Sequence, residues 1–139
     1  MTFVYTRGLD ELRNWETDTF KCLLVTSGYT PDRDHDYVDD VVPASNEITG
    51  AGYTRQTVAN AARTIDDAKD RIVYDADDFD FGSIAIGETV AGVVLYREVV
   101  DDSDSILIAY YSLGSIAATG HPFPVAVPAT GMIRTQDTW

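Results

Sequence analysis

The sequence predicts a mainly β protein, an antiparallel β-sandwich of immunoglobulin-like or jelly-roll-like type with one or two short helices. The strongest signal is the stretch 90–113, where the apolar runs 93–96 and 106–110 flank the acidic turn 101–105 in a β-hairpin pattern. Further short β-rich runs are separated by turn residues, which is typical of a sandwich or small barrel. A length of 139 residues fits a single domain, 1–139, with one hydrophobic core.

Both faces of the predicted 90–113 hairpin should be covered. Neither of its strands alternates polar with apolar residues, whereas a strand with one wet face does. Tyr110 and Tyr111 should point to opposite faces of one strand, because successive side chains alternate. The second face is then covered either by another sheet layer of this chain or by a neighbouring subunit. On sequence grounds this hairpin is the main argument for assembly over catalysis.

The N-terminal third should contain a short helix, a strand and a loop. Residues 8–15 favour the helix, because Leu9 and Leu12 lie at helical spacing and acidic residues occupy the first turn. Residues 20–26 are rich in β-forming types and predict a strand. Residues 29–41 follow as a loop or helical turn punctuated by proline.

The stretch 54–69 fits two structures when its residues are considered alone. Four apolar residues recur at helical spacing, namely Val58, Ala61, Ala62 and Ile65. Its β-branched residues and the pair Asp66-Asp67, which favours a turn, indicate strands instead. The residues alone leave both structures open.

The C-terminal part should hold an acidic turn at 75–78, a strand-like segment at 122–128 and a last strand at 132–134. Three prolines interrupt the 122–128 segment. Proline cannot donate to a β-ladder, so this segment is confined to a sheet edge or to extended chain. The pattern therefore allows an extended C-terminal arm at 120–139.

Charge and composition exclude some classes of function. The chain has 23 acidic and 10 basic residues and a formal net charge of −13, which repels phosphate backbones, so we expect no nucleic-acid partner. We expect no membrane association, because no apolar run approaches the roughly 18 residues that span a bilayer. The N-terminus does not resemble a secretory signal, so a cytoplasmic site of synthesis and assembly is expected.

The acidic loop 32–40 is the main candidate for a metal site. It opens with the pattern D-x-D-x-D, formed by Asp32, Asp34 and Asp36. An EF-hand loop would next require glycine and glutamate, and those positions hold Tyr37 and Pro43. A solvated acidic loop with Arg33 as counter-charge is favoured over an irregular calcium or magnesium site.

Other catalytic or cofactor patterns fail on residue type or spacing. The two histidines, His35 and His121, cannot build a histidine-rich zinc site. Ser83 lacks the G-x-S-x-G context of a nucleophile, and Cys22 has the setting of a small buried hydrophobe. The Gly50-Ala51-Gly52 stretch lacks the third glycine and the following helix of a dinucleotide-binding loop.

A cluster of carboxylates is the last candidate for catalysis. It could supply a pair for glycoside hydrolysis and consists of Asp75, Asp77, Asp78 and Asp80. Acidic turns are common in so acidic a protein, so we assign the cluster no role. The sequence assigns no catalytic, cofactor-binding or metal-binding residue, and we expect a protein that is not an enzyme and needs no cofactor.

Several segments occur together in a recognisable order. They are residues 15–21, 29–39, 47–55, 64–67 with 74–78, and 92–97 with 107–110, reading WETDTFK, YTPDRDHDYVD, EITGAGYTR, TIDD with YDADD, and GVVLYR with LIAY. In this order the chain resembles, over nearly its whole length, a family of small virion structural proteins of tailed bacteriophages. The resemblance implies turns at 66–67 and 75–78 and strands at 64–65 and 71–74. The proline-rich 122–128 segment departs from the family, which more often has an uninterrupted strand there.

The resemblance implies a non-enzymatic virion component assembled in the host cytoplasm. A decoration or auxiliary protein on the outer head surface is the favoured role, with the major capsid protein or other virion proteins as partners. A homo-oligomer is expected, and a trimer would suit the local threefold positions of a capsid. The alternatives are a neck, collar or tail-associated subunit and, second, a carbohydrate-binding or hydrolytic β-sandwich module.

Overall fold

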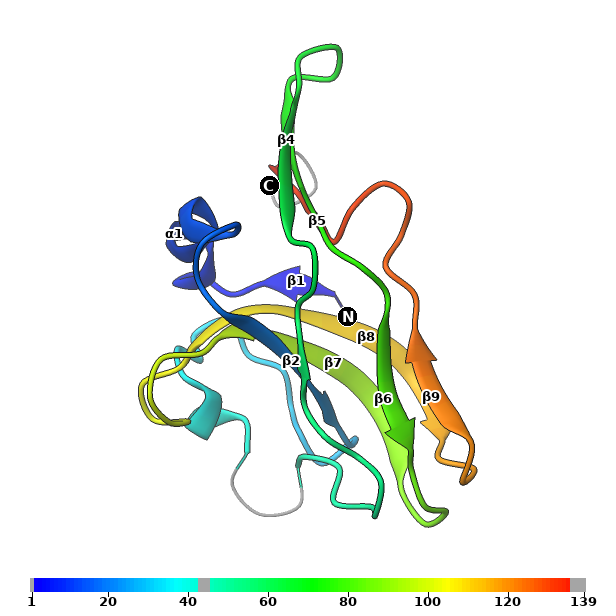
Figure 1. Cartoon of the computed structure of the whole chain (residues 1–139). Helices are drawn as coiled ribbons and strands as arrows, with labels where there is room; N and C mark the ends of the chain where they lie inside the picture. The colour runs from blue at the N-terminus through cyan, green and yellow to red at the C-terminus, as the bar shows by residue number, and fades with distance from the viewer. Residues whose placement is uncertain (1, 43–45, 136–139) are drawn as a thin grey trace.

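The computed structural model of the protein describes residues 2–42 and 46–135. Over these residues it is mainly β, with antiparallel sheets and one short α-helix, as the sequence predicts. The largest sheet in this part of the chain has the order β1 (Phe3–Val4), β8 (Ile106–Ala117), β7 (Thr89–Arg97), β2 (Phe20–Val25) and β3 (Gln56–Thr57) (Figure 1). Strands β7 and β8 confirm the predicted hairpin and are both longer than the apolar runs that predicted them.

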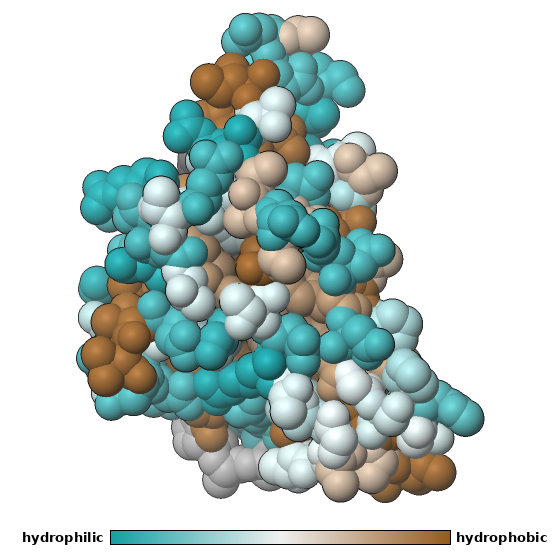
Figure 2. All heavy atoms as spheres, viewed as in Figure 1, coloured by the Kyte–Doolittle hydropathy of each residue, from teal (hydrophilic) through white to brown (hydrophobic). Residues whose placement is uncertain are grey.

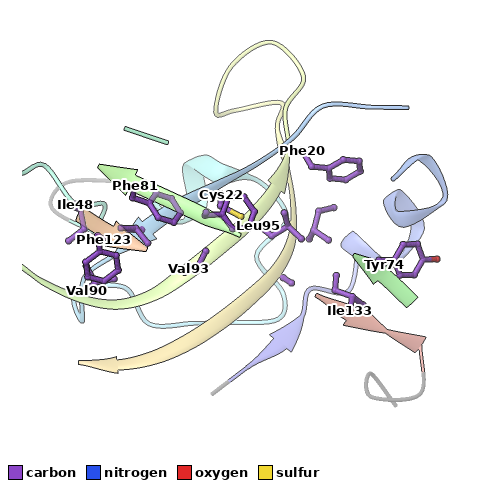
Figure 3. Close-up of a cluster of buried hydrophobic side chains, with 14 of the residues drawn as sticks. Phe20, Cys22, Ile48, Tyr74, Phe81, Val90, Val93, Leu95, Phe123 and Ile133 are labelled. Carbon is purple, nitrogen blue, oxygen red and sulfur yellow. The ribbon is translucent and has the colours of Figure 1, made fainter. Parts of the chain in front are cut away.

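Two smaller sheets complete the strand arrangement of the described residues. One has the order β10 (Ile133–Arg134), β5 (Arg71–Asp75) and β4 (Ala62–Asp66), and the other pairs β6 (Phe79–Ser83) with β9 (Pro122–Val125). Side chains from both small sheets and from one face of the large sheet meet in a single core cluster (Figure 3). The small sheets therefore form a second layer over that face.

The first core lies between these layers. Cys22 on β2 and Leu95 on β7 are register partners, and both are fully buried. Val93 lies on the same face of β7 and is also buried. Phe81 from β6 and Phe123 from β9 pack against them from the second layer (Figure 3). Because side chains alternate along a strand, the intervening residues of β2 and β7 point away from this core.

A second core covers the opposite face of the large sheet. Leu23, Val94 and Leu107 are fully buried there. Their cover is the segment 29–42, which contributes Tyr29 and, around the 3₁₀ turn η2 (Val38–Asp40), further buried side chains. Both faces of the β7–β8 hairpin are thus buried, as the missing alternation predicts. Of the two covers that the sequence left open, a part of this chain rather than a neighbouring subunit lies over the second face, and that part is the segment 29–42 rather than a sheet.

The predicted N-terminal helix is present as α1 (Gly8–Glu11), continued by the 3₁₀ turn η1 (Leu12–Asn14). It lies directly on β8, and the close approach requires glycine at position 8. A Cβ atom on Gly8 would lie 2.5 Å from the Cα of Ile108. Trp15, the residue that follows η1, is almost completely buried in the first core.

The stretch 54–69 forms strands, and the helical alternative is wrong. Strand β4 pairs with β5 through Thr64 opposite Val73 and Ile65 opposite Ile72. The helical spacing of its apolar residues has no counterpart in packing, because Ile65 is 60% exposed. β-Branched residues favour the strand here, and the turn lies at 67–70, one residue later than the pair Asp66-Asp67 predicted.

The described residues of the proposed C-terminal arm lie against the body. Strand β9 pairs with β6 at an edge, where its prolines interrupt no central ladder. Strand β10 pairs with β5 and confirms the predicted last strand. Phe123 and Ile133 are buried in the first core. Residues 136–139 of the proposed arm lie outside the described residues.

Candidate functional site

The three aspartates of the acidic loop do not converge. Asp32 accepts a hydrogen bond from the backbone N–H of Asp34 at 3.0 Å, whereas Asp36 pairs with Arg7 at 3.3 Å. Among residues 2–42 and 46–135 no group of three or more histidine, cysteine or acidic side chains is arranged to hold a metal ion. Pro43, at the position of the EF-hand glutamate, lies outside the described residues.

The histidine, serine and cysteine side chains weighed as chemical groups lie in separate places. The Nδ1 atom of His35 is hydrogen-bonded to the Tyr29 hydroxyl at 3.0 Å, and His121 is exposed in the loop before β9. Ser83 ends β6 at the surface. Cys22 is fully buried, and burial raises the pKa of its thiol, which disfavours the reactive thiolate.

Each carboxylate of the acidic cluster at 75–80 accepts a hydrogen bond from a different donor of the protein. Asp78 accepts a hydrogen bond from the backbone N–H of Val127 at 2.7 Å, and Asp80 accepts one from Gly82 at 2.9 Å. Asp77 accepts from the side chain of Asn60, and Asp75 from its neighbouring backbone N–H. Asp75 and Asp80 thus bind donors in their own turns, whereas Asp77 and Asp78 bind donors on distant segments of the chain, and each of the four carboxylates has a different donor.

A polar network that the sequence patterns did not reveal is centred on Arg55. Its Nε and Nη2 atoms each lie 2.8 Å from an oxygen of Glu47, and its Nη1 and Nη2 atoms lie 2.7 and 3.0 Å from those of Asp102. Its guanidinium also lies over the ring of Tyr96, 5.5 Å from the centroid. The Tyr53 hydroxyl donates to Glu47 at 2.7 Å. Glu47 and Tyr53 lie in the same short segment as Arg55, whereas Tyr96 and Asp102 come from the distant β7–β8 hairpin, so local spacing could not have indicated the whole network.

The Arg55 network holds two segments of the chain together, and we call it the Arg55 clamp. Hydrogen bonding to Glu47, the largest cause, raises the pKa of the Arg55 guanidinium, so the side chain stays charged. Five N–H donors in a planar fork match two carboxylates, and both pairs here are bidentate. The network therefore fastens the loop 47–55 to the turn between β7 and β8.

Replacing Arg55 by methionine should lower the free energy of unfolding by about 2 kcal/mol, because two partly buried carboxylates lose their shared cation. Urea unfolding followed by circular dichroism measures the change. The matched control is Arg13→Met, since Arg13 pairs with Asp10 at the surface, where ion pairs contribute about 0–1 kcal/mol. Equal effects of the two substitutions would contradict the clamp.

Two adjoining hollows lie where residues 126–134 cross β8. Their volumes are about 300 and 210 Å³. Thr2, Tyr111 and Met132 line both, and the Tyr111 hydroxyl donates to the Met132 carbonyl at 3.1 Å across them. The larger one is also lined by Arg33, whose guanidinium lies 5.2 Å from the ring centroid of Phe3. Its walls are mostly apolar side chains and backbone, and they bring together no catalytic set.

The β4–β5 hairpin, residues 62–75, projects from the body (Figure 1). Its base is fastened: the indole Nε1 of Trp15 donates to the Asp75 carbonyl at 3.0 Å, and Glu16 accepts from the backbone N–H of Arg63 at 2.9 Å. Four of the five residues of β4 are exposed.

The inner face of this hairpin runs from the core into solvent. Register partners share a face, so Tyr74 opposite Arg63 and Ile72 opposite Ile65 line the same side. Tyr74 is buried, Ile72 is partly buried, and Ile65 is 60% exposed. A row of apolar side chains thus extends from the first core toward the hairpin tip, and its outermost member, Ile65, is exposed.

Comparison of the chain with protein-family models, with curated proteins and with solved structures found no match. None of the helices in the described part of the chain is long and apolar enough to cross a membrane.

Proposed function

We propose that the chain is a non-enzymatic structural protein of a bacteriophage virion, a decoration or auxiliary protein on the outer head surface that stabilises the shell. The observation that carries the proposal is the projecting β4–β5 hairpin. Its inner row of apolar side chains ends at Ile65, which is 60% exposed. An uncovered apolar surface on an element that reaches beyond its own core suits contact with another protein.

The charge and the sequence resemblance support the same role. A net charge of −13 opposes placement against packaged DNA, since close approach of like charges is unfavourable without compensating cations. An outward position avoids this repulsion. The ordered segments that resemble small tailed-phage virion proteins include TIDD and YDADD, which form the projecting hairpin and its exit turn.

We further propose that the two β layers form an antiparallel sandwich of immunoglobulin-like or jelly-roll-like type. Such a fold presents loops and edge hairpins to neighbours. We also propose a homo-oligomer, with a trimer favoured because three copies suit a local threefold position. The major capsid protein is the partner beneath it.

Quantitative mass spectrometry of purified particles, combined with cryo-electron microscopy, tests this role. We expect many copies per particle and density on the outer head surface. A copy number that fits a single ring, with density at the neck or tail, would overturn the head placement in favour of a neck, collar or tail subunit. Absence of the chain from purified particles would overturn the virion role itself.

A further inference from the structure

The two adjoining hollows between β8 and the segment 126–134 differ in charge from the rest of the protein. We call them together the β8 hollow. The chain holds 23 acidic and 10 basic residues. The described residues that line the β8 hollow include two arginines, Arg33 and Arg134, and no acidic residue. Hydrophilic residues are spread over the whole face seen in Figure 2, and hydrophobic residues are exposed there at separate places. The β8 hollow is by contrast a recess with basic and apolar walls.

The smaller hollow, of about 210 Å³, forms the apolar end of this recess. Val93 of the large sheet and Phe79 of the second layer line it from the first core. Leu113, Val125 and Val127 also line it, and all three pack against the first core but are only partly buried. Apolar surface in contact with water is stabilised when an apolar group covers it. This end therefore favours an apolar ligand.

The larger hollow, of about 300 Å³, places a cation at the other end. The Arg33 guanidinium lies 5.2 Å from the ring centroid of Phe3, and both residues line this hollow. Among residues 2–42 and 46–135, no ion pair includes Arg33. Its sequence neighbours Asp32 and Asp34 do not line the hollow, and the Asp32 carboxylate accepts a hydrogen bond from the Asp34 backbone N–H. The Arg33 guanidinium can thus donate to an anionic group at this end.

The β8 hollow follows the strand after which it is named. Ala109 and Tyr111 line its larger part, and Tyr111 and Leu113 line its smaller part. These alternate residues share one face of β8, and four residues of a β-strand span about 13 Å. The segment 126–134 supplies a second wall, with Met132 in both parts. A narrow, elongated molecule therefore fits between these walls, whereas a folded protein surface does not.

We propose that the β8 hollow binds an amphipathic monocarboxylate of medium chain length. Its carboxylate pairs with Arg33, and its apolar chain lies along β8 with its end in the smaller hollow. Guanidinium and carboxylate groups form strong charge-assisted hydrogen bonds. Ligand sites in proteins are concave and mostly apolar, with volumes of about 300–1,000 Å³ and a few polar groups that fix the orientation. The inference goes beyond the proposed virion role and does not depend on it.

Isothermal titration calorimetry of the full chain with octanoate tests the site, because extended octanoate has about the length of the recess. We expect one molecule to bind per chain. Octanol lacks the carboxylate and acetate lacks the apolar chain, so each should bind at least about tenfold more weakly. A wild type that binds no octanoate at millimolar concentration, or that binds octanol equally well, would overturn the proposal.

Arg33→Met tests the anionic end, since methionine keeps an apolar side chain beside Phe3 and removes the charge. It should weaken octanoate binding at least about tenfold and leave octanol binding unchanged. The matched control is Arg13→Met, which removes an exposed arginine that pairs with Asp10 and does not line the hollow. This variant should bind octanoate like the wild type. Equal weakening by the two substitutions would reflect overall charge alone and contradict a site at Arg33.

Backbone amide chemical shifts locate the bound molecule. Titration with octanoate should shift the amide signals of residues 109–113 and 126–134 more than those of the projecting hairpin, 62–75. Largest shifts around the exposed Ile65 would place the binding on another apolar surface and sink the proposal. A negative result leaves the proposed function standing, because particle composition and microscopy measure virion placement separately.

Discussion

Raising the pH from 8 to 11 should lower the free energy of unfolding by at least about 4 kcal/mol and unfold the protein in one transition. Burial raises the pKa of Tyr5, Tyr53 and Tyr111 well above the usual value of about 10. These groups stay protonated in the fold but ionise in the unfolded chain. Their stabilisation is therefore complete below pH 10 and is lost as the pH rises above it.

The size of the effect follows from the number of groups. Each one lowers the free energy of unfolding by about 1.4 kcal/mol for every pH unit above its unfolded pKa, and three tyrosines act together. Cys22 adds to this loss of stability, and its share begins at a lower pH, because the ordinary pKa of a thiol is about 8.5 and burial raises it in the fold. The free energy of unfolding of a protein domain is about 5–15 kcal/mol in total, so unfolding near pH 11 is expected.

Circular dichroism and tyrosinate absorbance at alkaline pH, followed together, measure this transition. The two signals should change at the same pH, since ionisation requires unfolding. Tyr111→Phe should reduce the pH dependence by about one proton, because this hydroxyl is enclosed and donates to the Met132 carbonyl. Tyrosinate absorbance that rises fully while the β signal persists would contradict the prediction.

Local patterns predicted several strands of this fold and left the stretch 54–69 open between helix and strand. The hairpin of β7 and β8 was predictable because its apolar runs and acidic turn are contiguous in the chain. The short helix before Trp15 was predictable for the same reason. In the stretch 54–69, the strands that β-branched residues favour formed despite a helical spacing of apolar residues, and the resemblance had indicated the same result.

Those local patterns could not predict contacts between residues that are distant in the sequence. The missing alternation in 90–113 correctly indicated two covered faces, but it could not identify what covers them. The cover of the second face proved to be the segment 29–42, whose acidic residues suggested a metal loop and whose Tyr29 and Val38 are core residues. The Arg55 clamp was hidden for a similar reason, since Glu47 and Asp102 are brought together only by the folded chain.

The assembly surface that we propose is the β4–β5 hairpin. The apolar runs 93–96 and 106–110 of the β7–β8 hairpin are covered on both faces by other parts of the chain. The β4–β5 hairpin, whose residues alone did not decide between helix and strand, projects instead and leaves Ile65 exposed. A two-stranded hairpin is marginal in water by itself, so its order depends on the fastening at its base.

Trp15 is central to that fastening, and Trp15→Ala should lower the free energy of unfolding by about 3–5 kcal/mol. Its side chain is 1% exposed and packs against Phe20 and Tyr74, with ring centroids 4.8 and 6.2 Å apart. Its indole N–H also donates to the Asp75 carbonyl at the end of β5. Removing the ring leaves a cavity at the junction of the body and the hairpin. Urea unfolding followed by circular dichroism measures the loss.

Trp15→Phe separates packing from hydrogen bonding, because it keeps an aromatic ring and removes the donor. We expect it to cost about 1–2 kcal/mol, mostly from the Asp75 carbonyl left without that partner. Amide hydrogen exchange locates the effect: in Trp15→Ala the N–H groups of β4 and β5 should exchange faster by a larger factor than those of β7 and β8. A uniform acceleration would show that Trp15 stabilises the whole core equally. Selective loosening would instead show that the projecting hairpin is held in place by one buried ring, and that its position depends on the packing beneath it.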